Sequence, residues 1–196
     1  TYTLDPVDDL EPGTYIAGVW CTMEESPIDQ AFPTMEFQVG TATVQPDIVG
    51  NCGDCHYGPE SGKYYLAHID PGRSPVGNYA LDSAPVTTCK TCHNQEGYAA
   101  YCSDREESPC SAPNRVPDPI VRRAHGVHNG SRLRSAFNID SENGDFKDYT
   151  HVVFPAEVRN CTKCHLDESW KTKPSRLACG ACHDYVDFAT GVLDPP

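Results

Sequence analysis

The chain has 196 residues, a formal charge of −13 at neutral pH and 11 cysteines. Its acidic balance offers no Lys/Arg-rich surface, so we expect no nucleic-acid partner. No run approaches the roughly 18 to 20 apolar residues of a membrane span. The cysteine content needs an explanation by disulfides, metal or a covalently attached cofactor.

The first 48 residues contain no cysteine-based motif and read as strands. Two runs bounded by Gly and Pro, Thr14–Trp20 and Glu36–Val44, have strand-like composition. We therefore predict a small β-rich N-terminal region over residues 1–48, followed by a second region over residues 49–196.

The second region repeats one short pattern, C-x-x-C-H, four times. This is the attachment signature of c-type haem, in which two thiols bond to the vinyl groups and the adjacent histidine binds the iron. Zinc ribbons and thioredoxin-like dithiols also use C-x-x-C, but neither needs a histidine directly after the second cysteine. The pattern predicts four haem c groups per chain, each with a histidine on its proximal face. The predicted attachment cysteines are Cys52, Cys55, Cys89, Cys92, Cys161, Cys164, Cys179 and Cys182, and the proximal ligands are His56, His93, His165 and His183.

The histidines outside the motifs equal the haems in number. Four haems need four distal ligands, so the sequence predicts bis-histidine ligation throughout and haems closed to substrates. Met23 and Met35 are the rival ligands, and a His/Met haem would have a higher reduction potential than a bis-histidine one. The predicted distal ligands are His68, His125, His128 and His151.

Spacing adds two expectations about the haem arrangement. His125 and His128 are three residues apart, which on a helical turn projects both rings from one side, toward two neighbouring haems. Only residues 165–178 separate Cys164 from Cys179, too little chain to build a core between the last two sites. We therefore expect the last two haems to lie close together.

The fold class that follows is a multihaem cytochrome c. We expect it to be mostly irregular, with short helices around the haem sites and a core built from four stacked haems. Only 38% of the residues are hydrophobic, against about 45 to 50% in an average domain, so porphyrins would supply the missing apolar volume. The fold is expected to collapse without haem.

Three cysteines lie outside the motifs: Cys21, Cys102 and Cys110. A disulfide between Cys102 and Cys110 would leave Cys21 over, but Cys21 could pair with either, and the sequence leaves the pairing open. Haem attachment and disulfides both point outside the cytoplasm. The chain starts at Thr1 without an apolar leader or an anchoring cysteine, so we expect a removed targeting peptide and a released protein. Asn129 and Asn160 match the glycosylation pattern, which occurs often by chance.

Three segments extend a likeness beyond the motifs: Arg122–Gly130, His151–His165 and Trp170–Asp184. Together they resemble the OmcA/MtrC family of outer-surface multihaem cytochromes, convincingly over residues 120–191 and more loosely over residues 36–60. Family members typically carry ten or more haems and often a lipid anchor, whereas this sequence has four motifs and starts with Thr1. A compact four-haem chain of this kind is similar to extracellular cytochromes that polymerise into conductive filaments.

The resemblance implies electron transfer at the cell surface or outside the cell, after export through the periplasm. The implied partners are other copies of the chain in a head-to-tail polymer, redox partner cytochromes and extracellular electron acceptors. His68 is our candidate for a distal ligand that crosses between subunits, against the alternative that it serves a haem of its own chain.

Three other functions stay open as alternatives. One is a multihaem reductase with one substrate-accessible haem, which is disfavoured because all four motifs are regular and enough histidines remain. The others are a soluble periplasmic electron shuttle and a haem-storage or gas-sensing module. We expect an electron carrier rather than an enzyme.

Overall fold

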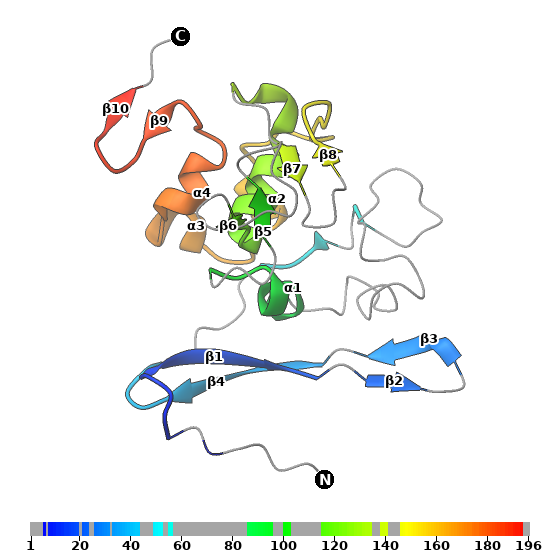
Figure 1. Ribbon diagram of the computed structural model, residues 1–196. Coiled ribbons are helices and arrows are strands. Elements are labelled where there is room, and N and C mark those ends of the chain that lie inside the picture. Colours follow the sequence, from blue (N-terminus) through cyan, green and yellow to red (C-terminus); the bar gives the residue numbers. More distant parts are fainter. Residues whose placement is uncertain are drawn as a thin grey trace. The chain divides into compact units, whose positions relative to one another are not determined.

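The computed structural model describes residues 6, 8–19, 21–23, 26–31, 33–43, 49–52, 55–56, 86–95, 100–102, 115–134, 138–140 and 146–193. The backbone divides into two compact units, Thr1–Thr91 and Cys92–Pro196. Figure 1 shows the short elements of both units. No helix in the described part of the chain is long and apolar enough to cross a bilayer.

The first unit is built from two antiparallel hairpins and one helix. Its elements are β1 (Gly13–Gly18), β2 (Cys21–Met23), β3 (Ser26–Ala31), β4 (Thr34–Val39) and helix α1 (Val86–Cys92), which ends at the boundary between the units. β1 pairs with β4 from Gly13 opposite Val39 to Gly18 opposite Thr34, and β2 pairs with β3. The predicted strands at 14–20 and 36–44 are thus confirmed as β1 and β4, with earlier ends.

Local chemistry explains the β1–β4 hairpin. The rings of Tyr15 and Phe37, directly opposite each other in the ladder, lie 5.8 Å apart, and such cross-strand aromatic pairs stabilise a sheet. β4 is followed by Gly40, whose φ of +63° is one that residues with side chains rarely adopt. Strand β4 therefore ends before the predicted run does.

Helix α1 lies against strand β4 in the same unit. The hydroxyls of Thr34 and Thr87 are 2.7 Å apart, and Lys90 Nζ is 3.9 Å from a carboxylate oxygen of Glu36. Thr87 is buried. These contacts fix the helix that carries the second C-x-x-C-H cysteine pair.

The second unit consists of short helices and two-stranded ribbons. Its elements are β5 (Ala100–Cys102), β6 (Arg115–Pro117), α2 (Ile120–His128), η3 (Gly130–Arg132), β7 (Asn138–Asp140), β8 (Phe146–Asp148), η4 (Cys161–Lys163), α3 (Ser169–Thr172), α4 (Arg176–Gly180), β9 (Val186–Asp187) and β10 (Val192–Leu193). Each described strand pairs with one partner, β5 with β6, β7 with β8 and β9 with β10. Helix α2 contacts helix α4, as Figure 1 shows.

The turn after α2 approaches another segment closely. Gly130 follows the helix, and a Cβ atom built there would lie only 2.0 Å from the carbonyl oxygen of Tyr149. No side chain fits in that space, so the Asn129-Gly130 sequence is what lets residues 149–152 pass against the end of α2. The amide of Ser131 then donates to the carbonyl of Val152 at 3.0 Å.

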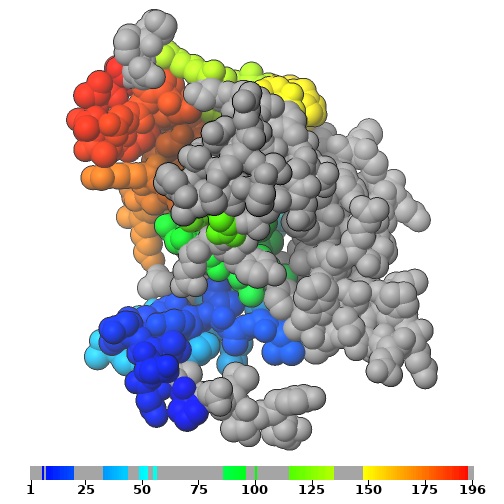
Figure 2. All heavy atoms as spheres, viewed as in Figure 1, coloured from blue at the N-terminus to red at the C-terminus, as the bar shows by residue number. Residues whose placement is uncertain are grey.

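The described residues form no conventional apolar core. Among them, Ala181 is the single buried hydrophobic residue, whereas the buried polar residues are Thr87, Thr88, Asp118, Asn129 and Ser169. Several large apolar side chains are exposed instead, including Trp170, Val192 and Leu193. They belong to the segment from α3 to β10, coloured orange to red in Figure 2. A chain of this size normally buries a contiguous cluster of large apolar side chains.

The predicted β-rich region agrees with the positions of β1 to β4, which all fall within residues 1–48. The predicted boundary after residue 48 differs from the division by backbone contacts, which falls inside α1. An independent N-terminal domain stays a prediction, and so does a core made of haem.

Candidate haem sites

The four C-x-x-C-H segments share one local conformation. In three of them the carbonyl oxygen of the first cysteine accepts hydrogen bonds of 2.8 to 3.3 Å from the amides of the second cysteine and of the histidine. In the remaining segment both cysteines lie in helix α1. Residues three apart on a helical turn face the same side, so each segment presents two thiols together. The three turns are Cys52–His56, Cys161–His165 and Cys179–His183, and the helical pair is Cys89 and Cys92.

The motif cysteines are in the thiol form. Burial raises the pKa of the Cys92 thiol and of the Cys182 thiol above the ordinary value. Both are the second cysteine of their motif. In a redox-active C-x-x-C dithiol it is the first cysteine that needs a lowered pKa, so these two shifts do not separate a redox dithiol from thiols that bond to a cofactor.

A hydrogen bond and burial fix the ring of His93, the predicted proximal ligand of the second motif. The Nδ1 atom of His93 donates to the backbone carbonyl of Asp118 at 2.9 Å, and the His93 side chain is only 12% exposed. This bond leaves Nε2 as the ring nitrogen for a metal, the arrangement found around most metal-binding histidines. Burial lowers the pKa of His93, so its imidazole is neutral at pH 7, which is the ligating form.

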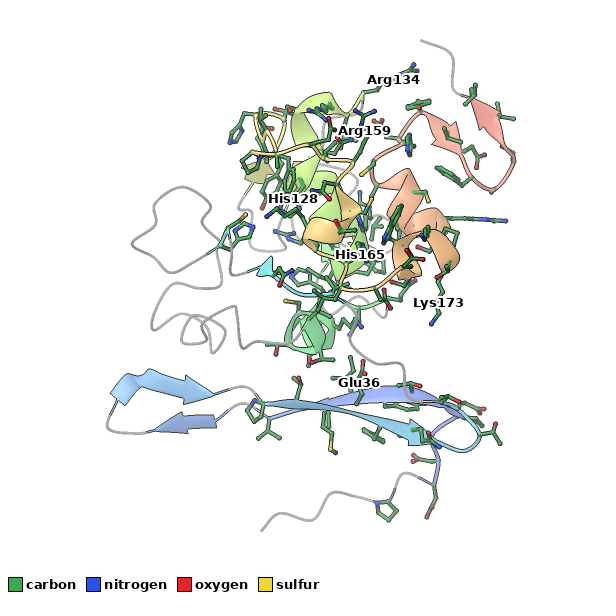
Figure 3. The ribbon with its side chains drawn as sticks, turned by 180° about the vertical axis from the view of Figure 1, so that it is seen from behind. Glu36, His128, Arg134, Arg159, His165 and Lys173 are labelled. Atoms are coloured by element: carbon green, nitrogen blue, oxygen red, sulfur yellow. The ribbon has the colours of Figure 1, made fainter. Side chains whose placement is uncertain are left out.

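The third motif brings together two residues that are 40 positions apart in the numbering, His125 and His165. Their ring centroids are 6.1 Å apart, with 22° between the ring planes. Two imidazoles that bind one iron from opposite faces, at about 2 Å each, have centroids roughly 6 Å apart. The pair therefore fits the proximal and distal ligands of a single haem. Figure 3 labels His165 beside helix α2, which carries His125.

Hydrogen bonding at this pair is unequal. The Nδ1 atom of His125 donates to the carbonyl of Val121 at 2.6 Å, one turn earlier in α2, which leaves Nε2 for a metal. The Nδ1 atom of His165 is buried and has no hydrogen-bond partner among the residues that the structure describes. The pKa of His165 is lowered by burial and then by the nearby His125. No hydrogen bond at Nδ1 fixes the His165 ring, so a bond to iron is what would orient it.

The fourth motif is attached to the end of helix α2. The side-chain amide of Asn129 donates to the carbonyl of Cys182 at 3.2 Å, and the Cys182 thiol lies 3.8 Å from the carbonyl oxygen of His125. After burial, the charges of Cys179 and Cys161 also raise the pKa of Cys182. The Cys182 thiol therefore lies near enough to Cys161 of the third motif to be affected by its charge. That the last two haems lie close together stays a prediction.

The proximal histidine of the fourth motif is exposed and contacts a tyrosine. The Nδ1 atom of His183 lies 3.3 Å from the hydroxyl of Tyr185, and the two rings meet edge to face. The guanidinium carbon of Arg134 lies over the Tyr185 ring, 4.8 Å from its centroid. Tyr185 thus contacts the ligand and a cation at once.

The remaining predicted ligands are placed less completely. His128 lies on α2 with its ring edge against Phe154, and His151 is exposed; Figure 3 labels His128. His56 is partly buried in its turn. The predicted helical turn over 125–128 is confirmed, since both histidines belong to α2.

His68 and Cys110 lie outside the described residues, and only the backbone of Cys21, Met23 and Cys102 is described, in β2 and β5. Met35, the rival ligand, is 64% exposed.

Three residues that touch the motifs were not predicted from the sequence: Asp118, Asn129 and Tyr185. The sequence offers one sign of the role of Asp118: it precedes a proline at the start of a helix, and arginines follow it four and five residues later, within reach of an ion pair. Nothing in the sequence distinguishes Asn129 or Tyr185 from ordinary surface residues. Their roles depend on which distant segment packs beside them.

Within the described ranges, no group of three or more His, Cys, Asp or Glu side chains lies close enough to hold a metal ion. A haem iron takes only two protein ligands, so the haem interpretation needs no such group. Comparisons with protein-family models, curated proteins and solved structures find no match to this chain.

Proposed function

We propose that this protein transfers electrons through four covalently attached c-type haems, each bound by two histidines. The observation that carries the proposal is the common helical turn at the C-x-x-C-H segments together with the His125–His165 pair. The turn gathers two thiols on one side, and the pair has the separation of two ligands on one iron. The scarcity of buried apolar side chains among the described residues supports the proposal as well, because porphyrins would supply apolar volume.

The residues divide the work in a simple way. The thiols hold the cofactor permanently, while the two imidazoles bind from opposite faces and exclude a substrate. When bound, haem supplies reversible one-electron chemistry. Helix α2 links three sites directly: Ile120 donates to the His93 carbonyl, His125 pairs with His165, and Asn129 donates to Cys182. One rigid element therefore holds three sites at fixed distances, which suits a relay of electrons.

Intact mass tests the cofactor count. We expect the mature protein to exceed the polypeptide mass by four haems, because four motifs offer four pairs of thiols. The visible spectrum should be that of low-spin haem. A protein that carries zinc and no added porphyrin mass would contradict the proposal, and a shortfall of one haem would break the match between haems and distal histidines.

We also propose that the protein works outside the cell or at its surface as the subunit of a head-to-tail filament. Support comes from the resemblance to the OmcA/MtrC family and to filament-forming four-haem cytochromes. Head-to-tail contacts that do not close into a ring generate filaments. A histidine donated to the next subunit is replaced by one received from the previous subunit, so the balance of two ligands per haem is kept. A short relay would thereby become a continuous one.

Substituting His68 tests the filament. We expect His68→Ala to give separate subunits with one high-spin haem each, visible as particles rather than filaments in electron micrographs. His151→Ala is the matched control, because it also removes a predicted distal ligand but should leave filaments intact. Filaments of the His68→Ala protein would show that the bridging ligand is elsewhere or that none exists.

A further inference from the structure

Asp118 is a buried carboxylate that the function described so far does not use. It lies between β6 and α2, and it is 1% exposed. Among the described residues it is the largest side chain that is fully buried. Carboxylates are almost never fully buried unless a partner compensates their charge.

Two arginines of helix α2 hold this charge. The Nη1 atom of Arg123 donates to Asp118 Oδ2 at 2.7 Å, and the Nη1 atom of Arg122 donates to Oδ1 at 3.4 Å. Arg123 also donates through Nη2 to the hydroxyl of Tyr149 at 3.0 Å. Charge-assisted bonds of this kind are stronger than neutral ones, and a negative charge suits the N-terminal end of a helix. The carboxylate is therefore fixed in place.

The same residue touches the proximal ligand of the second motif. Its backbone carbonyl accepts the bond from His93 Nδ1 at 2.9 Å, and its Oδ2 atom is 4.0 Å from that nitrogen. The next helical residue returns a bond, from the Ile120 amide to the His93 carbonyl at 3.0 Å. His93 is thus held between its own motif and the start of α2, beside the Asp118 carboxylate and the guanidinium of Arg123, whose opposite charges both act on the ring.

We propose that Asp118 is a positioning residue that orients His93 and lowers the reduction potential of the haem attached to Cys89 and Cys92. The inference rests on the proposed haem function. A histidine binds its metal through one ring nitrogen. When its other ring nitrogen donates a hydrogen bond to a carbonyl or carboxylate, the histidine becomes a stronger electron donor to the metal. The Asp118 carboxylate offsets part of the positive charge of Arg122 and Arg123 near the ligand, so it favours the ferric state relative to a neutral side chain at the same position, because the low local dielectric screens these charges weakly. At the third motif, by contrast, no described residue accepts a hydrogen bond from His165 Nδ1.

Redox titration of the holoprotein tests this inference, with haem-methyl NMR signals assigning each potential to its haem. Asp118→Asn removes the charge but keeps the backbone carbonyl. The potential of the haem on Cys89 and Cys92 is expected to rise, by about a tenfold change in its oxidised-to-reduced ratio, which is about 59 mV for one electron. Arg123→Gln removes the opposing charge and should lower the same potential. A merely structural role would not give shifts of opposite sign.

Glu157→Gln is the matched control. Glu157 pairs with Arg159 at 3.1 Å as a carboxylate–arginine contact, but both side chains are largely exposed, so no potential should move. Unchanged potentials in Asp118→Asn with all four haems attached and low-spin, or shifts of one sign in both variants, would overturn the inference. If Asp118→Asn does not fold, Arg123→Gln decides alone, and an unchanged or higher potential counts against it. A parent protein without covalent haem would instead refute the proposed function.

Discussion

Replacing His125 by alanine is expected to open one haem per chain, the one attached to Cys161 and Cys164. The reason is the 6.1 Å separation between the rings of His125 and His165, which matches two ligands of one iron. Alanine is the best helix former, so α2 should persist while the ligand is lost. The measurement is a high-spin signal together with the binding of one carbon monoxide per chain to the reduced protein. The parent, with every haem closed, should bind none.

Two further variants sharpen this test. His128→Ala should open a different haem, because two histidines on one turn of α2 are predicted to reach two neighbouring haems. His125→Met keeps a ligand and should retain a low-spin haem at a higher potential, since His/Met ligation raises the potential above that of two imidazoles. If His125→Ala leaves all haems low-spin, or opens the same haem as His128→Ala, the assignment of His125 to His165 is wrong. Carbon monoxide binding by the parent would favour the reductase alternative.

The second large effect is expected when the protein is made without haem attachment. We expect no cooperative thermal transition in the haem-free chain, because the described residues bury a single hydrophobic side chain, Ala181. Burial of apolar area is the main favourable contribution to folding, at roughly 25 cal/mol per Å², and ordering the backbone costs about 1 to 2 kcal/mol per residue. Without porphyrin surface this cost is not offset.

Circular dichroism during heating, compared between haem-free and mature protein, measures this difference. The mature protein should unfold in a defined transition, since covalent haem remains in its interior. As a control, all motif cysteines are replaced by alanine, so that the chain cannot attach haem. This variant should also show no cooperative thermal transition. A sharp cooperative transition in either haem-free form would contradict the prediction and imply an independent protein core.

Local features were the part of the structure that the sequence predicted well. The helical turn at C-x-x-C-H is closed by bonds within five residues, so its conformation is encoded where it lies. Strands β1 and β4 were predicted for the same reason, from runs bounded by Gly and Pro. The helix over 125–128 followed from the histidine spacing. Only the ends differed, as at Gly40, where backbone conformation rather than composition stops the strand.

Pairings between distant segments were not predictable. The histidine count gave the number of distal ligands, but it did not say that His125 meets His165. The role of Asp118 could not be predicted, because its burial depends on contacts with Arg123 and, through Arg123, with Tyr149 further along the chain. Asn129 is similar, since a single side-chain bond to Cys182 defines its role. Local turns could therefore be predicted from spacing, whereas contacts between distant segments depended on packing; the haem chemistry itself stays a prediction.

The self-contained attachment turns have a consequence for biogenesis. Each turn at Cys52, Cys161 and Cys179 closes through its own backbone bonds, so bringing its two thiols together requires no other part of the molecule. If the proposed haem attachment holds, an enzyme that joins porphyrin to the chain would need to recognise only these few residues, and attachment could precede the contacts between distant segments.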